Sequence, residues 1–269
     1  MKLISNISRY ENFKNFSQKS GEIFDNSIAS KILNQSSTET ASTLSRWNKQ
    51  GLIFRISQGF YALVPVDASS KNFTLEDPWI LAPKLFGECY VGGVSALEYW
   101  DLTEQIFNKI LIFTTKKVRK MEIQIAGQNF SATHIQKSQL FGLSVVWRKQ
   151  TKVMISDIHR TLLDAFNDPS NGGGIQHSVD CLKKYLQREE ADLKKLEEYA
   201  IKLNNGAVFK RLGYLFSVFL GENHPITKSF KSRITKGYSY LDPKQKMEVK
   251  LVTDWNLFVP QSFAEDKIL

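Results

Sequence analysis

The stretch from Ser36 to Lys49 gathers the side-chain types that proteins use to contact DNA. Hydroxyl groups hydrogen-bond to phosphates or to base edges, and an arginine can donate two hydrogen bonds to a guanine or to a phosphate. Arg46 is the arginine of this stretch that could form such a pair of hydrogen bonds. The residues of this stretch that we expect to face DNA are Ser36, Ser37, Thr38, Thr40, Thr43, Arg46 and Lys49. For Ser36 to Thr38, a cluster that only caps a helix is the alternative.

A short hairpin follows this stretch. Residues 52–56 and 60–64 are apolar, and a Ser-Gln-Gly turn separates them, which predicts two short strands. The tip carries Arg55, Ser57 and Gln58, which we expect to lie against the DNA backbone or the minor groove. The alternative for Arg55 is a solvated strand residue without a partner in nucleic acid.

Basic residues are also concentrated in two places further along the chain. Residues 116–120 read Lys-Lys-Val-Arg-Lys, and residues 206–250 carry nine basic against three acidic side chains, interleaved with Phe230, Tyr238 and Tyr240. Such mixtures suit nucleic acid, because cations contact phosphates and rings stack on bases. For 116–120, a solvated turn that protects strand edges is the alternative. The expected basic surface comprises Lys116, Lys117, Arg119, Lys120, Lys210, Arg211, Lys228, Lys231, Arg233 and Lys236.

Catalytic chemistry has one weak candidate, a metal-dependent nuclease. Glu248, Lys250 and the upstream Asp242 could together hold a divalent ion and polarise a phosphate, but a further acid is missing. The four histidines show no helical pairing, and neither Cys89 nor Cys181 is placed with one, so no zinc site is expected. No nucleophile elbow, phosphate-binding loop or dinucleotide fingerprint is present. We expect no enzyme, no metal and no cofactor.

Composition sets the broad class of the protein. The 269 residues are 42% hydrophobic and carry a net charge of +9, so a sizeable core and an anionic partner are both expected. Two cysteines far apart indicate a reducing compartment. No apolar run reaches membrane-spanning length, so we expect a cytoplasmic protein with no membrane partner.

The first 65 residues predict three helices and a hairpin. Phe13 and Phe16 lie on one face of a helix that ends before Gly21, and a second helix begins at an Asp25 or Asn26 cap. In the third helix we expect residues 41, 44 and 47 to face the core, with Gly51 as its stop. Helix, short helix, turn, helix and hairpin is the order of a winged helix-turn-helix, whose second motif helix enters the DNA major groove.

Four stretches resemble the AbiEi family of abortive-infection antitoxins. The first is "LSRWNKQGLIFRISQGFYALVP" (44–65). The second contains Tyr90, Ser95, Ala96, Leu97, Leu102 and Thr103. The third is a helix with Asp157, Arg160, Thr161 and Asp164, and the fourth is Arg-Leu-Gly-Tyr-Leu (211–215). His159 replaces a glutamate that is usual in the family, so a role that needs this carboxylate is in doubt; for Asp157 and Arg160, capping and solvating the helix is the structural alternative.

The resemblance implies a type IV toxin–antitoxin system in phage defence. In that family the winged helix represses the antitoxin–toxin operon by binding inverted repeats. The C-terminal domain counteracts a nucleotidyltransferase toxin without a stable complex. Double-stranded DNA is thus the expected partner, with RNA a candidate at the C-terminal basic face. The alternatives are a stand-alone regulator with a sensing or dimerisation domain, and the nuclease.

The expected fold class is α+β. Residues 1–66 form the winged helix-turn-helix, 67–77 a polar linker, and 78–269 a larger α+β domain with a small sheet, packed helices and a basic C-terminal face. Alternating or continuous apolar segments predict the strands of that domain at 109–115, 121–127, 129–135, 143–149 and 152–156.

Overall fold

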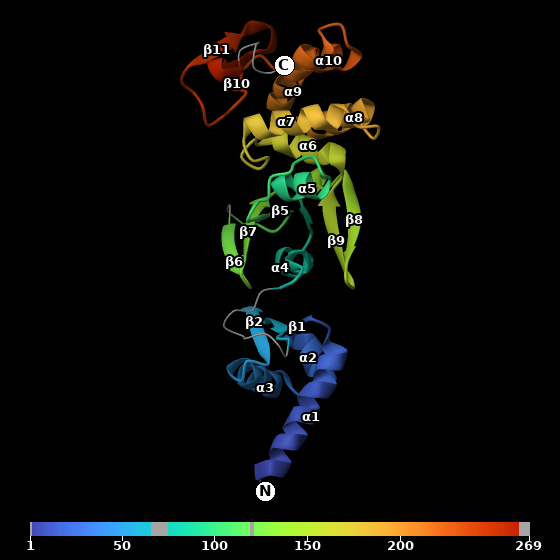
Figure 1. The fold of residues 1–269 in the computed structure, drawn as a ribbon, viewed down its shortest axis with the longest axis vertical. Coiled ribbons are helices and arrows are strands. Elements are labelled where there is room, and N and C mark those ends of the chain that lie inside the picture. The colour runs from blue at the N-terminus through green and yellow to red at the C-terminus, as the bar shows by residue number, and fades with distance from the viewer. Residues whose placement is uncertain (1, 66–74, 119–120, 264–269) are drawn as a thin grey trace. The chain divides into compact units, whose positions relative to one another are not determined.

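The protein has a mixed α+β fold, seen in a computed structural model that describes residues 2–65, 75–118 and 121–263 (Figure 1). The chain divides into two compact units, Met1–Glu76 with Gln124–Asn129, and Asp77–Ile123 with Phe130–Leu269. Most of the expected 67–77 linker lies outside the described residues. No helix in the described part of the chain is long and apolar enough to cross a membrane.

The N-terminal unit combines three helices with a three-stranded antiparallel sheet of order β1-β3-β2. Its elements are α1 (Lys2–Ser20), β1 (Ile23–Asp25), α2 (Asn26–Leu33), α3 (Ser37–Lys49), β2 (Ile53–Ser57) and β3 (Phe60–Leu63). Asp25 accepts a hydrogen bond from the Ile28 N–H, which starts α2, and Asn34 ends that helix in the left-handed conformation. The expected helices and hairpin are therefore present.

Aromatic side chains form the core of this unit. Trp47 of α3 packs edge-on against Phe13 at a centroid distance of 5.1 Å, and Phe16 of α1 lies 4.8 Å from Phe24 of β1. Tyr61 of β3 stacks on Phe24. These rings join β1 and β3 to α1 and α3, and Ile53 of β2 is buried in the same cluster, which explains how such short strands are stabilised.

A six-stranded mixed sheet of order β6-β7-β5-β4-β9-β8 lies mainly in the second unit, while residues 124–125 of β6 and 128–129 of β7 fall within the residue range of the first unit. β4 pairs parallel with β9 and β5 parallel with β7, whereas β4–β5 and β8–β9 are antiparallel. Its strands are β4 (Cys89–Val91), β5 (Ile110–Thr114), β6 (Met121–Ile125), β7 (Gln128–His134), β8 (Leu143–Arg148) and β9 (Thr151–Ser156). All five predicted strands of this region are present.

The central strand β4 is absent from the sequence-based expectation. The strand is only three residues long, and Gly92 separates it from the short helix α5 (Gly93–Tyr99). A buried strand of three apolar residues has no periodicity to read, so only its pairing on both edges reveals it. The segment at 78–86 is also divided, into a 3₁₀ turn η2 (Pro78–Leu81) and α4 (Ala82–Phe86).

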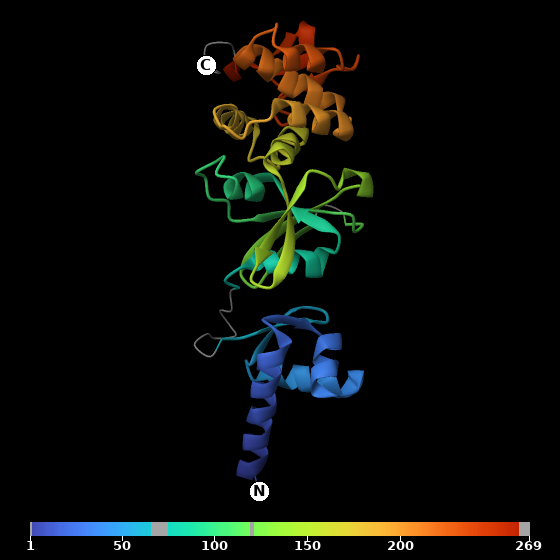
Figure 2. The same ribbon diagram turned by 90° about the vertical axis from the view of Figure 1, so that its right-hand side faces the viewer.

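Five helices follow the sheet: α6 (Ile158–Asn167), α7 (Ile175–Leu186), α8 (Leu193–Leu203), α9 (Gly206–Leu220) and α10 (Pro225–Lys231). α6 packs against α5, α7, α8 and α9, and α9 packs against α10. Both views show this helical layer between the six-stranded sheet and the C-terminal end of the unit (Figure 2).

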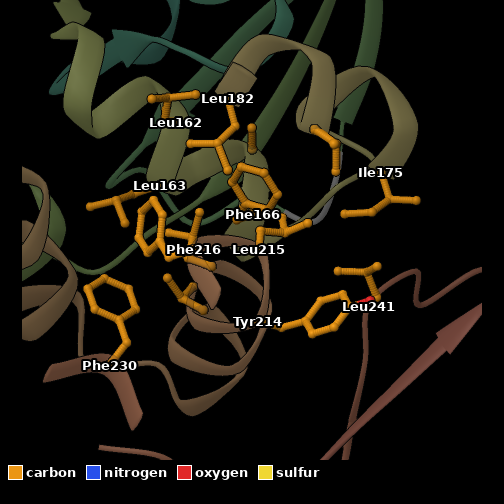
Figure 3. Close-up of a cluster of buried hydrophobic side chains, with 14 of the residues drawn as sticks. Leu162, Leu163, Phe166, Ile175, Leu182, Tyr214, Leu215, Phe216, Phe230 and Leu241 are labelled. Carbon is orange, nitrogen blue, oxygen red and sulfur yellow. The ribbon is translucent and has the colours of Figure 1, made fainter. Parts of the chain in front are cut away.

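The largest hydrophobic core of the protein lies among these helices. Phe166 of α6 and Phe216 of α9 are fully buried, and Phe230 of α10 packs on Phe216 at 5.4 Å (Figure 3). Gly213 of α9 allows the closest approach: a Cβ there would lie 2.1 Å from the ring of Trp255. A helix that is apolar nearly all round thus packs on both sides.

The chain ends in a small sheet of order β10-β12-β11, formed by β10 (Ser239–Tyr240), β11 (Val249–Val252) and β12 (Leu257–Pro260). The last two strands of this sheet are joined by a short connection. A 3₁₀ turn η4 (Thr253–Trp255) and a left-handed Asn256 reverse the chain, so β11 and β12 pair antiparallel. β10 pairs parallel with β12.

Candidate nucleic-acid interface

The helix α3 is anchored at both ends. Ser36 and Glu39 form a reciprocal capping box at its start, with the Glu39 N–H donating to the Ser36 Oγ and the Ser36 N–H donating to the Glu39 carboxylate. The hydrogen bonds that Ser36 donates lower the pKa of Glu39, so its carboxylate stays ionised. At the far end, the Asn48 Oδ1 accepts a 3.0 Å hydrogen bond from the Arg55 N–H of β2. This bond ties the helix to the hairpin.

The exposed face of α3 is polar and carries two cations. Ser37, Thr38, Arg46 and Lys49 are exposed, as predicted. Neither Arg46 nor Lys49 forms a salt bridge with any residue that the structure describes. The residues of this face that the sequence reasoning missed are Ala41, Ser42 and Ser45. Steps of three and four residues along a helix place them on the same face as Thr38, Arg46 and Lys49, so this spacing could have identified them.

The predicted DNA contacts of Thr40, Thr43 and Ser36 need correction. Thr40 and Thr43 are buried, and the Thr43 hydroxyl donates to the Gln35 side chain, so neither faces solvent. Ala41, which we assigned to the core, is exposed instead. Leu44 and Trp47 are buried as expected, and Thr40 and Thr43 complete the buried stripe of α3 in place of Ala41. The Ser36 hydroxyl is occupied by the capping box.

The hairpin presents its tip to solvent. Arg55 and Gln58 are exposed, Ser57 is half-buried, and the strand register shifts between Arg55 and Ser57. Gly59 adopts a φ of +81°, which the turn requires, and its carbonyl accepts from the Asn26 N–H. The tip is thus held against the start of α2 while Arg55 stays open to a ligand; no salt bridge to Arg55 exists among the described residues.

The predicted basic surface of the second unit is divided in the structure. Lys116, Lys117, Lys228 and Lys236 are exposed, whereas Arg119 and Lys120 lie outside the described residues. Lys231 donates to the Asp254 carbonyl and lies over the Trp255 ring. Arg233 donates to Ser229 and pairs with Glu197 at 3.8 Å.

Lys210 and Arg211 are not part of any surface. Lys210 is 1% exposed and donates to the Gly237 carbonyl, and Arg211 donates to the Tyr240, Phe166 and Asn167 carbonyls. Burial lowers the pKa of Lys210 and lowers that of Arg211 to about 10. Both side chains cross-link α9 to neighbouring segments, because a buried cation needs acceptors and carbonyls supply them.

Tyr90, Arg160 and Asp164 form a buried network in the second unit. The Arg160 Nε donates to the Asp164 carboxylate at 2.8 Å, and its Nη2 donates to the Tyr90 hydroxyl at 2.9 Å. Tyr90 in turn donates to Asp164 at 2.9 Å. Arg160 Nη1 also donates to the Gln139 and Phe141 carbonyls. The network connects β4, α6 and the loop before β8, so Arg160 is a buried structural residue and not the solvated one we considered.

The other residues of that motif start α6 and fix its neighbours. Asp157 caps the helix by accepting from the Arg160 N–H, and it accepts a second bond from the Tyr199 hydroxyl. The Tyr185 hydroxyl forms a 2.9 Å hydrogen bond with the His159 Nδ1 and accepts a second one from the Asp192 N–H. Burial lowers the pKa of His159. Burial thus favours the neutral form of the His159 ring.

The residues considered for catalysis do not form a site. Among the described residues, no group of three or more His, Cys, Asp or Glu side chains is placed to hold a metal ion. One sequence statement is wrong: Cys181 lies 3.8 Å from the His177 Nε2, because residues four apart share a helix face. Burial raises the pKa of the Cys181 thiol to about 12, which keeps it protonated near neutrality. A pocket of about 360 Å³ borders this pair.

No protein-family model matches the chain, and no curated protein matches it. Among solved structures, the chain is similar to the crystal structure of the RV2827C protein from Mycobacterium tuberculosis. The TM-score is 0.63 and the sequence identity 13%, over 94% of this chain and 90% of that chain. At this identity the similarity concerns the fold, and it extends over nearly the full length of both chains.

Proposed function

We propose that the N-terminal unit is a winged helix-turn-helix that binds double-stranded DNA. The observation that carries the proposal is that α3 and the β2–β3 tip, tied by the Asn48–Arg55 hydrogen bond, both expose cations without intramolecular partners among the described residues. In a winged helix, the third helix enters the major groove and the hairpin contacts the backbone. Arg46 would then contact a guanine or a phosphate, and Arg55 a phosphate.

The test uses the full-length protein and a labelled duplex from the region upstream of its own gene. Arg46→Ala and Arg55→Ala should each weaken binding and each lower the slope of log affinity against log salt by about one. Arg46→Ala should also reduce discrimination between the cognate and a scrambled duplex. Arg55→Ala should leave discrimination nearly unchanged, because phosphate contacts carry no sequence information.

Lys14→Ala provides a charge-matched control. Lys14 is an exposed cation of α1, away from α3 and the hairpin tip in sequence, so its removal lowers the net charge equally. It should leave affinity and salt slope within error of the unaltered protein. Equal affinities for all three variants at low salt would eliminate the winged-helix proposal.

We further propose that the protein is the DNA-binding antitoxin of a type IV system, which represses its own operon and counteracts a nucleotidyltransferase toxin through its second unit. Support comes from the resemblance in four stretches of the chain. The residues of the third stretch are engaged in the Tyr90–Arg160–Asp164 network, so they support a shared fold more directly than a shared activity. The antitoxin role therefore needs its own test.

Co-expression with the neighbouring toxin gene tests that role. The Arg46→Ala, Arg55→Ala double variant should still restore growth when expressed from an unrelated promoter, because neutralisation resides in the second unit. A chain that binds its operator but never restores growth would identify a stand-alone regulator and refute the antitoxin assignment.

A further inference from the structure

The C-terminal sheet has an aromatic outer face. Leu257 and Val259 of β12 are buried against the helical layer, so Phe258 between them points to the opposite side. The register aligns Phe258 with Tyr240 of β10 and with Leu251 of β11. Directly opposed residues share a face, so these three side chains form one row across the sheet.

An exposed tyrosine lies next to a stacked pair of rings on this face. Tyr240 stacks on Phe258 at a centroid distance of 4.9 Å and an interplanar angle of 26°. Tyr238 contacts Phe258 at 5.6 Å and is 62% exposed. Phe230, which the sequence pattern grouped with these tyrosines, is fully buried and belongs to the helical core. An exposed aromatic ring beside a stacked pair leaves a free ring surface for a further planar group.

Lysines flank the aromatic row on both sides in sequence. Residues 228–250 contain seven Lys or Arg against two Asp or Glu. The exposed cations of this segment nearest to the row in sequence are Lys236, Lys244, Lys246 and Lys250. Within the described residues none of these four forms a salt bridge, unlike Lys231 and Arg233. The positive charge is therefore available to a polyanion.

We propose that the outer face of the β10-β12-β11 sheet binds single-stranded nucleic acid. Tyr238 offers its ring face to an unpaired base beside the stacked Tyr240–Phe258 pair, and the flanking lysines contact phosphates. A duplex does not fit this chemistry, because its base faces are already stacked and only phosphates remain accessible. The row also contains no carboxylate, and the surplus of cations favours a polyanion over an apolar protein segment. This surface is separate from the one proposed for duplex DNA.

Fluorescence anisotropy with the full-length protein tests the proposal, using 12-nucleotide mixed-sequence RNA and DNA strands with one label each. Tyr238→Ala should lower the affinity for a single strand about 5- to 100-fold, the range of one base–aromatic stack, whereas Tyr238→Phe should retain it. Lys244→Ala with Lys246→Ala should lower the salt slope by about 1.4. The strand bound more tightly, RNA or DNA, identifies the natural polymer.

Two further variants separate this surface from other sites. Trp147→Ala removes another exposed ring, 67% exposed on β8, and should not change single-strand affinity. Arg46→Ala should weaken duplex binding alone, so failure of the winged-helix proposal and failure of this one are distinguishable. The proposal is overturned if neither strand binds at low salt, if Trp147→Ala loses as much single-strand affinity as Tyr238→Ala, or if Tyr238→Ala keeps the wild-type affinity. It is also overturned if this face binds a protein partner instead of a single strand.

Discussion

Replacing Asp164 by asparagine should expose how much the second unit depends on its buried ion pair. Arg160 is 1% exposed and Asp164 2%, so the pair is shielded from water. Asp164→Asn keeps the size of the side chain but leaves the guanidinium with only neutral acceptors, the Gln139 and Phe141 carbonyls and the Tyr90 hydroxyl. Removing one member of a buried pair costs about 3–5 kcal/mol of unfolding free energy.

Tyr90→Phe provides a comparison for the loss of unfolding free energy in Asp164→Asn. The hydroxyl accepts from Arg160 and donates to Asp164, so its removal leaves each partner one hydrogen bond short but keeps the ion pair. We expect a cost of about 1–3 kcal/mol, smaller than that of Asp164→Asn. Replacing all three polar residues together by Phe, Met and Leu should cost less than Asp164→Asn alone, because no uncompensated charge then remains buried.

Urea unfolding at pH 7, followed by circular dichroism and tryptophan fluorescence, measures these differences. Two units can unfold separately, so the transition that contains the helical layer is fitted alone. Asp180→Asn, at an exposed carboxylate of α7, should shift the free energy by less than about 0.5 kcal/mol. The reasoning is refuted if Asp164→Asn costs no more than Tyr90→Phe.

Three other perturbations have defined outcomes. Burial lowers the pKa of His159, so the folded state favours the neutral ring. The stability that this preference contributes is present above pH 6.5 and is lost as the pH falls below that value, by at most about 1.4 kcal/mol per pH unit. His159→Gln should flatten this pH dependence of the urea unfolding midpoint between pH 7.5 and 5.5. Thr40→Val should raise the free energy of unfolding by about 1 kcal/mol, because the Thr40 hydroxyl is buried without a partner in the described part of the chain. Thr43→Val should lower it by a similar amount in the same urea titration, because the Thr43 hydroxyl donates to the Gln35 side chain. Gly213→Ala should lower the melting temperature in calorimetry despite the better helix propensity of alanine, since its Cβ has no room beside the indole; Gly237→Ala, where nothing lies within 4 Å, should not.

Local sequence patterns predicted most of the elements but not their exact faces. The hairpin at 53–63 and the five strands from 110 to 156 follow from alternation and turn residues, because these signals are local. On α3 the expected core residues Leu44 and Trp47 are buried, but Thr40 and Thr43 are buried in place of Ala41. Side-chain polarity alone would place the threonines outside, and only the packing of the helix in the unit shows that they are inside. The three-residue strand β4 was missed because pairing on both edges, and not its own pattern, defines it.

The candidate sites divide in the same way. Charge and composition alone predicted cations at Arg46, Lys49 and Arg55, and all three are exposed. The sequence could not show that Lys210 and Arg211 are buried, because their hydrogen-bond acceptors lie on segments 27 to 45 residues away in the chain. Charge marks a residue as basic, and long-range packing decides whether it reaches a ligand.

By itself, then, the sequence determined the α+β class, the order of helices and strands in the N-terminal unit, and the surplus of positive charge, all of which depend on neighbouring residues. Only the tertiary structure decided that Tyr90 meets Arg160 and Asp164, and that Tyr238 and Tyr240 both pack against Phe258. Arg160 and Asp164 are four residues apart on one helix, but Tyr90 lies 74 positions before Asp164, and Phe258 lies 18 positions after Tyr240. Strand register and helix packing bring these distant residues together, and no local pattern encodes those contacts.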